Sequence, residues 1–166
     1  MELLKLATDW ARDEIFSSKF FILFGLIFII ASIGFWQLGK TDMAKAFVTP
    51  TLVTGVLLII VGGGLYYSNT QRLKNFPIEY KADASAFLDS ELERAEKTVK
   101  EFDNVVLKVI PAIVAVCALL IIFVDKPVWR AACIATIGML VIIMAVDINS
   151  SARMKEYHKA LLEQKE

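Results

Sequence analysis

The sequence predicts an all-α integral membrane protein built as a bundle of four transmembrane helices. Three observations predict this fold class: 57% of the 166 residues are hydrophobic, charged residues avoid four long tracts, and a heptad pattern of apolar residues continues into one of these tracts. An ordinary soluble domain averages ~45–50% apolar residues. A large buried soluble core is the alternative, but four such tracts in so short a chain favour the membrane.

The four tracts without charge set the positions of the spans. They are residues 20–39, 46–71, 109–124 and 131–146. A membrane-spanning helix needs ~20 mostly apolar residues at a rise of ~1.5 Å each. The last two tracts reach this length when the charged residues at their ends lie at the membrane interfaces. We therefore expect spans at residues 20–39, 50–67, 105–124 and 128–147.

The third span should continue a long charged helix that begins in water. Residues 79–104 interleave acidic and basic side chains, and no strong breaker separates them from the span at 105–124. Apolar side chains recur along this helix at steps of four and three, a pattern typical of a packed helical seam. The candidate interaction seam consists of Leu88, Leu92, Val99 and Phe102.

Amphipathic helices at both termini complete the predicted architecture of a single membrane domain. Residues 1–16 place apolar side chains on one face and charged side chains on the other. The serines at 17 and 18 should separate this helix from the first span. Residues 148–164 should extend the fourth span into the cytosol, and Pro77 should separate the second span from the long helix.

Two features should disturb helices within the membrane. The second span contains Gly62, Gly63 and Gly64, and each glycine costs ~1 kcal/mol relative to alanine inside a helix. Gly55 and Gly62 lie one heptad apart on one face, which predicts the close approach of a neighbouring helix. An unwound segment lining a transport path is the alternative. Pro111 removes a backbone hydrogen bond and should kink the third span.

The distribution of basic residues predicts the topology. Of the 18 lysines and arginines, 14 precede the first span, lie between the second and third, or follow the fourth. Basic residues concentrate on the cytosolic side of membrane proteins. We therefore expect a protein of the plasma (cytoplasmic) membrane, the inner membrane of a bacterial cell, with both termini and the long helix in the cytosol.

Few residues could carry chemistry. His158 is the only histidine, which excludes a bis-histidine haem or a His-rich metal site within one chain. Cys117 and Cys133 lie inside predicted spans and are best interpreted as small packing residues. The net charge is zero, so no attraction to nucleic acid is implied. The sequence thus predicts no catalytic residue, no cofactor and no metal ligand.

Lys108 and Asp147 are the best candidates for functional charges near the membrane. Both should lie at similar depth near the cytosolic interface, where a charge costs less than at the bilayer centre. They could belong to an ion or proton path. The interpretation we favour is that both side chains end their spans at the interface.

These observations predict a non-enzymatic scaffold or accessory subunit that acts through its cytosolic helices. A small oligomeric channel or transporter is the alternative, although ionisable residues are nearly absent from the middle of the spans. The terminal helices are too short to cover the whole seam. We therefore expect Leu88 and Leu92 to meet a second copy of the chain or a partner membrane protein; the alternative is that the helix folds back under its own bundle.

The topology can be tested with reporter fusions. Fusions after Gln71, Asp103 and Glu166 should all report a cytosolic position, and a fusion after Lys126 should report an external one, because the basic residues are distributed asymmetrically. Alkaline phosphatase and green fluorescent protein give the two opposite signals. An external reading at Asp103 would contradict the topology.

Overall fold

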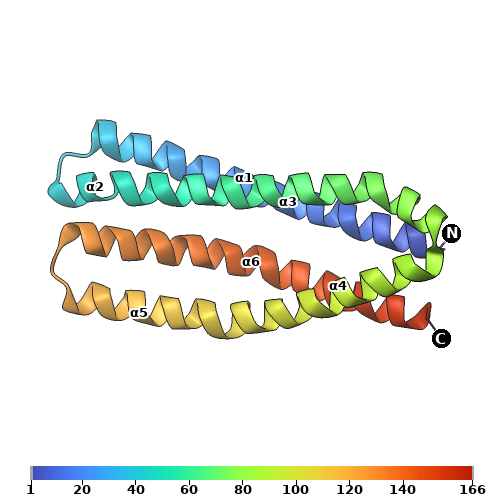
Figure 1. Cartoon of the computed structure of the whole chain (residues 1–166). Coiled ribbons are helices and arrows are strands. Elements are labelled where there is room, and N and C mark those ends of the chain that lie inside the picture. The colour runs from blue at the N-terminus through green and yellow to red at the C-terminus, as the bar shows by residue number, and fades with distance from the viewer. Residues whose placement is uncertain (1, 166) are drawn as a thin grey trace.

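The computed structural model describes residues 2–165, which form two helical hairpins lying side by side (Figure 1). The first hairpin contains α1 (Glu2–Leu38), the short α2 (Asp42–Ala46) and α3 (Val48–Ala82). The second contains α4 (Ala84–Asn104), the π-helical turn η1 (Val105–Val109), α5 (Ile110–Phe123) and α6 (Pro127–Glu163). No strand occurs in the described part of the chain, which confirms the all-α prediction.

The two hairpins point in the same direction. Their connections, residues 39–47 and 124–126, lie together at what we call the loop end (Figure 1). The two chain termini and the turn between α3 and α4 lie at the opposite end, the terminal end. Each of the four long helical segments contains a stretch that is long and apolar enough to cross a membrane, so the prediction of four apolar helices is confirmed.

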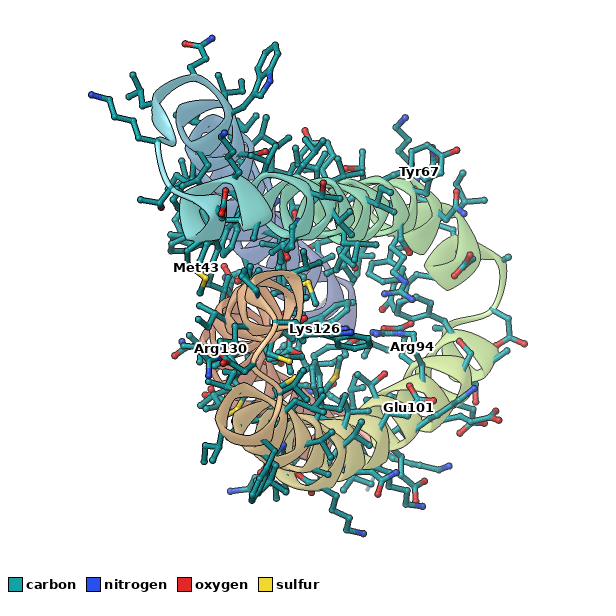
Figure 2. All side chains as sticks on the ribbon, turned by 90° about the vertical axis from the view of Figure 1, so that its left-hand side faces the viewer. Met43, Tyr67, Arg94, Glu101, Lys126 and Arg130 are labelled. Carbon is teal, nitrogen blue, oxygen red and sulfur yellow. The ribbon has the colours of Figure 1, made fainter. Side chains whose placement is uncertain are left out.

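Helix α6 is the central element of the bundle. It packs against α1, α3 and α4 as well as against its hairpin partner α5, whereas α1 and α3 pack along each other. Figure 2 looks along the bundle from the loop end and shows Arg94 pointing inward from α4, while Tyr67 points away from α3. Helices α5 and α6 are antiparallel neighbours, joined by the short connection at residues 124–126.

Glycines allow α1 and α3 to approach closely. A Cβ atom on Gly55 would lie 2.7 Å from the carbonyl oxygen of Gly25, and one on Gly62 would lie 2.8 Å from the Cβ of Phe21. No atom lies within 4 Å of such a position on Gly63 or Gly64. The predicted close approach at Gly55 and Gly62 is therefore confirmed, and α3 remains helical through all three consecutive glycines.

The expected break at Ser17 and Ser18 is wrong, because α1 is one continuous helix. The Ser18 hydroxyl donates a hydrogen bond to the carbonyl oxygen of Ile15 at 2.7 Å, within its own helix. The Ser17 hydroxyl oxygen accepts a hydrogen bond from Arg153 of α6. Both serines are thus accommodated inside the helix, and the amphipathic N-terminal segment and the first apolar segment form one element.

The boundary between α3 and α4 also differs from the expectation. Helix α3 includes Pro77 and continues to Ala82, so the long helix begins at Ala84 rather than at residue 79. Asp83 has an extended backbone, and its carboxylate accepts hydrogen bonds from the backbone N–H groups of Ser85 and Ala86 at 2.9 and 3.0 Å. An aspartate N-cap of this kind satisfies the free N–H groups that begin a helix. Here the cap, and not the proline, sets the boundary.

The disturbance expected at Pro111 takes the form of the π-helical turn η1. The Ile110 N–H donates to the carbonyl oxygen of Val105, five residues earlier. Proline has no N–H to offer the carbonyl four residues before it, which belongs to Leu107 within this turn. The helix nevertheless continues from Ala84 to Phe123, so the predicted long helix does run into the third apolar segment.

The α1–α3 contact gives a stability prediction. Gly55→Ala should lower the free energy of unfolding by about 1–3 kcal/mol, because the added methyl group overlaps the Gly25 backbone. Gly64→Ala is the matched control and should leave stability unchanged or raise it by up to ~1 kcal/mol through helix propensity. Denaturant titration in detergent micelles measures both variants; equal effects would contradict the close contact.

Candidate functional site

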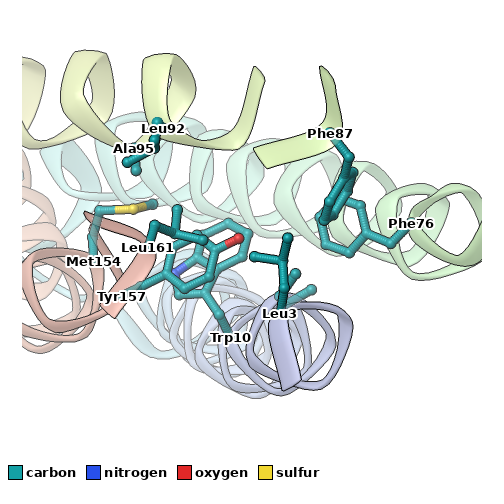
Figure 3. Close-up of a cluster of buried hydrophobic side chains, with 11 residues drawn as sticks. Leu3, Trp10, Phe76, Phe87, Leu92, Ala95, Met154, Tyr157 and Leu161 are labelled. Carbon is teal, nitrogen blue, oxygen red and sulfur yellow. The ribbon is translucent and has the colours of Figure 1, made fainter. Parts of the chain in front are cut away.

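Buried side chains gather at the terminal end, where α1, α3, α4 and α6 meet. Figure 3 shows this cluster, with Trp10 and Tyr157 at its centre and residues of α4 covering them from one side. The buried members are Leu3, Ala7, Trp10, Ala11, Phe76, Phe87, Leu92, Ala95, Met154, Tyr157 and Leu161. These residues come from α1 and α3 of the first hairpin and from α4 and α6 of the second, so the cluster joins the two hairpins.

A carboxylate lies within this apolar cluster. Glu91 is only 5% exposed, and it accepts a hydrogen bond from the Tyr157 hydroxyl at 2.7 Å. The Arg94 guanidinium donates to both oxygens of the same carboxylate, through Nε at 2.9 Å and through Nη2. A buried charge is stable only when it is paired and hydrogen-bonded. Glu91 meets both conditions with one partner on its own helix and one on α6.

Aromatic rings cover the positive charge of this pair. The Trp10 and Tyr157 rings stack with their centroids 5.4 Å apart, and the Arg94 guanidinium carbon lies 4.2 Å from a ring centroid of Trp10. The guanidinium carbon of Arg72 on α3 lies 5.8 Å from a ring centroid of Trp10. Cations over an indole ring are attracted by its electron-rich face. Trp10 therefore links α1 to both α3 and α4.

The environment of the cluster shifts the pKa values of three side chains, Tyr157, Arg94 and Arg72. Burial, together with the negative charge of Glu91, raises the pKa of the Tyr157 hydroxyl well above its ordinary value. Burial tends to lower the pKa of Arg94, but its hydrogen bond and ion pair with Glu91 outweigh that effect and raise it. For Arg72, burial and the neighbouring charge of Arg94 lower the pKa. Tyr157 consequently stays protonated at neutral pH and acts as a hydrogen-bond donor.

A second ion pair connects α1 and α6 nearer the apolar segments. Arg153 donates through Nη2 to a Glu14 oxygen at 2.9 Å and to the Ser17 hydroxyl at 2.7 Å. The Ser150 hydroxyl donates to the other Glu14 oxygen at 2.5 Å. Both partners are largely shielded from water, because the Glu14 side chain is 12% exposed and that of Arg153 is 29% exposed.

Beside this ion pair lies a cavity of about 250 Å³ bounded by α1, α3, α4 and α6. Glu14, Ser17, Ser18, Asp147 and Ser150 contribute its polar lining. Asp147 also lines a neighbouring depression of about 220 Å³ that includes Glu101 and Phe102 of α4. The polar lining is confined to the part of the bundle near the terminal end.

The structure places the candidate seam inward. Leu92 is buried in the terminal-end cluster, and Leu88, Val99 and Phe102 pack against that cluster. The expectation that the terminal helices of the same chain fail to cover these residues is therefore wrong for Leu92, whereas Leu88 stays partly exposed. The terminal segments belong to the long helices α1 and α6, which pack against each other, and α4 packs against α6.

The two candidate interfacial charges do not meet. Lys108 lies exposed on η1, whereas Asp147 lines the cavity, and no ion pair joins them in the described part of the chain. Among residues 2–165, no three histidine, cysteine, aspartate or glutamate side chains are arranged to hold a metal ion.

Sequence reasoning did not single out Trp10, Glu14, Arg94, Tyr157 or Arg153. A signal for the first two is present, because Leu3, Ala7, Trp10, Glu14, Ser17 and Phe21 repeat at steps of three and four along α1. Glu91 follows the same logic on α4, since it lies beside Leu92 on the apolar face. A carboxylate that interrupts an apolar helical face indicates a buried polar contact.

Comparison of the chain with protein-family models, with curated proteins and with solved structures gives no significant match.

The buried pair gives a second stability prediction. Glu91→Gln should lower the free energy of unfolding by about 3 kcal/mol, because it leaves the Arg94 charge without its carboxylate in a shielded position. Glu96→Gln is the matched control on the same helix, where the carboxylate pairs with Lys100 in water, and it should have little effect. Denaturant titration followed by tryptophan fluorescence compares the two; similar losses would show that Glu91 is not held as described.

Proposed function

We propose that this protein is a non-enzymatic membrane scaffold or accessory subunit whose terminal end lies in the cytosol. The observation that carries the proposal is the terminal-end cluster, which unites all four long helices into one body beyond their apolar segments. The 21 residues of α4 extend ~31 Å at ~1.5 Å per residue. A rigid helical platform of this length is suited to holding a partner at a fixed distance from a membrane.

The outward face of α4 is the surface that we assign to the partner. With the apolar seam buried, α4 presents exposed charges of both signs, and these line a shallow groove on its surface. The lining residues are Glu93, Glu96, Lys97, Lys100, Glu101 and Asn104. Interleaved charges of this kind favour a protein surface with complementary charges over a lipid surface, because they carry no excess of positive charge.

A small oligomeric channel or transporter is the second candidate function. The cavity lined by Asp147 is the observation that favours it, because charged groups at membrane depth often mark substrate paths. Near the loop end, the Ser32 hydroxyl donates a hydrogen bond to the carbonyl oxygen of Val48 at 2.7 Å. The Thr51 hydroxyl donates one to the carbonyl oxygen of Phe47 at 2.6 Å. Both hydroxyls are thus already hydrogen-bonded within the chain.

Site-specific photo-crosslinking in intact cells tests the scaffold function. A photoreactive phenylalanine analogue at Lys97 or Lys100 should yield a discrete crosslinked product with another protein, since both side chains are exposed on the groove. The same analogue at Leu92 is the matched control and should yield no product between chains, since Leu92 is buried. Absence of any product at Lys97 and Lys100 would contradict the assigned surface.

Liposome flux separates the two functions. Purified protein reconstituted at increasing protein-to-lipid ratio should leave proton and monovalent-cation permeability at the level of empty liposomes if the protein is a scaffold. A flux that rises more steeply than linearly with protein density, and that Asp147→Asn abolishes, would instead support an oligomeric channel or transporter.

A further inference from the structure

The cavity between α1, α3, α4 and α6 is lined by side chains of two kinds. Its polar lining consists of the carboxylates and hydroxyls of Glu14, Ser17, Ser18, Asp147 and Ser150. Its apolar lining consists of Phe21, Val61, Leu65, Phe102, Ile143 and Val146. A lining that combines apolar side chains with a few polar groups is typical of sites for small organic molecules.

Of the two carboxylates that line this cavity, only Glu14 has an ionic partner. Arg153 neutralises Glu14, and both Glu14 oxygens are engaged, one by Arg153 and one by Ser150. Asp147 makes no hydrogen bond or ion pair with any side chain in the described part of the chain. Asp147 is partly removed from water, and a carboxylate in such a position is stabilised by a positively charged partner. The cavity therefore has the electrostatic character of a site for one positive charge.

The size of the cavity and its apolar lining determine what kind of cation fits. A bare metal ion binds through several oxygen ligands within a few ångströms, whereas this cavity of about 250 Å³ offers one unpaired carboxylate and six apolar side chains. Two of those side chains, Phe21 and Phe102, present aromatic rings, which attract organic cations. We propose that the cavity binds an amphipathic organic ammonium ion, with its nitrogen at Asp147 and its hydrocarbon part against Phe21 and Phe102.

A depression on the α4 side adjoins the cavity. Phe102 and Asp147 line both the cavity and the neighbouring depression, whose other residues include Thr98 and Glu101 of α4 and Val105 of η1. Glu101 is exposed, so the depression opens at the surface. A ligand entering here could be a soluble amine or the ethanolamine headgroup of a phospholipid. Both carry the same primary ammonium group.

Equilibrium dialysis of the full-length protein in maltoside micelles tests the site. The probe is radiolabelled 2-phenylethylammonium, and the comparison ligand is 2-phenylethanol, which has the same carbon skeleton but no charge. We expect saturable binding of one ammonium ion per chain and no saturable binding of the alcohol. Asp147→Asn should raise the dissociation constant of the ammonium ion at least tenfold, because it removes the negative charge that pairs with the nitrogen.

Two further variants keep the test specific. Asp125→Asn, on the exposed α5–α6 connection, removes a carboxylate of equal size far from the cavity and should leave binding unchanged. Val146→Phe fills the cavity while retaining Asp147, and it should abolish binding even if Asp147→Asn fails to fold, with thermal unfolding as the check on both. No saturable binding, equal binding of the alcohol, or unchanged binding by Asp147→Asn would each overturn the proposal.

Added phospholipid identifies the natural source of the ammonium group. If phosphatidylethanolamine raises the apparent dissociation constant of the probe and phosphatidylglycerol does not, the site takes a lipid headgroup. If neither lipid competes, the site takes a soluble amine, and the proposal holds in both cases. Binding at equilibrium requires neither a partner nor transport, so its result is independent of the crosslinking and flux experiments.

Discussion

The assembly of the terminal end depends on satisfying the carboxylate of Glu91 where it is almost removed from water. Arg94, one turn away, forms an ion pair with this carboxylate, and the Tyr157 hydroxyl on α6 donates a hydrogen bond to it. Trp10 then covers the guanidinium from α1. The interactions of this one charged group therefore fix three helices relative to one another. A displacement of any of them would break a hydrogen bond to the carboxylate or the contact between the guanidinium and the Trp10 ring.

Different interactions hold the apolar part of the bundle together. A protein in lipid gains little from burying one apolar side chain against another, so close packing and local hydrogen bonds must hold its helices together. The contact of Gly25 with Gly55 supplies the close packing between α1 and α3. Helix α5 packs mainly on α6, and it leaves Val116, Leu119 and Ile122 exposed. The two hairpins are thus joined chiefly through α6 and the terminal end.

The four long apolar helices could be predicted from the sequence, because tracts without charge are a strong signal. The contact at Gly55 and Gly62 was predictable for a similar reason, since small residues one heptad apart leave room for a neighbouring helix. Boundaries were harder to predict. Pro77 is the more familiar breaker, yet the carboxylate of Asp83 satisfies two backbone N–H groups and begins the next helix. The contact of Glu91 with Tyr157 and that of Glu14 with Ser150 were not predictable, because each partner lies on α6, distant in sequence.

The parallel arrangement of the two hairpins has a consequence for the order in which the chain folds. Helices α1 and α3 are neighbours in sequence and can pack as soon as α3 has been synthesised. Trp10, in contrast, stacks on Tyr157 of α6, which is synthesised after α1, α3, α4 and α5. The apolar face around Leu3, Ala7 and Trp10 therefore lacks its α6 partners until α6 has been synthesised. During that interval the nascent chain exposes a surface of the kind that chaperones bind and that promotes aggregation.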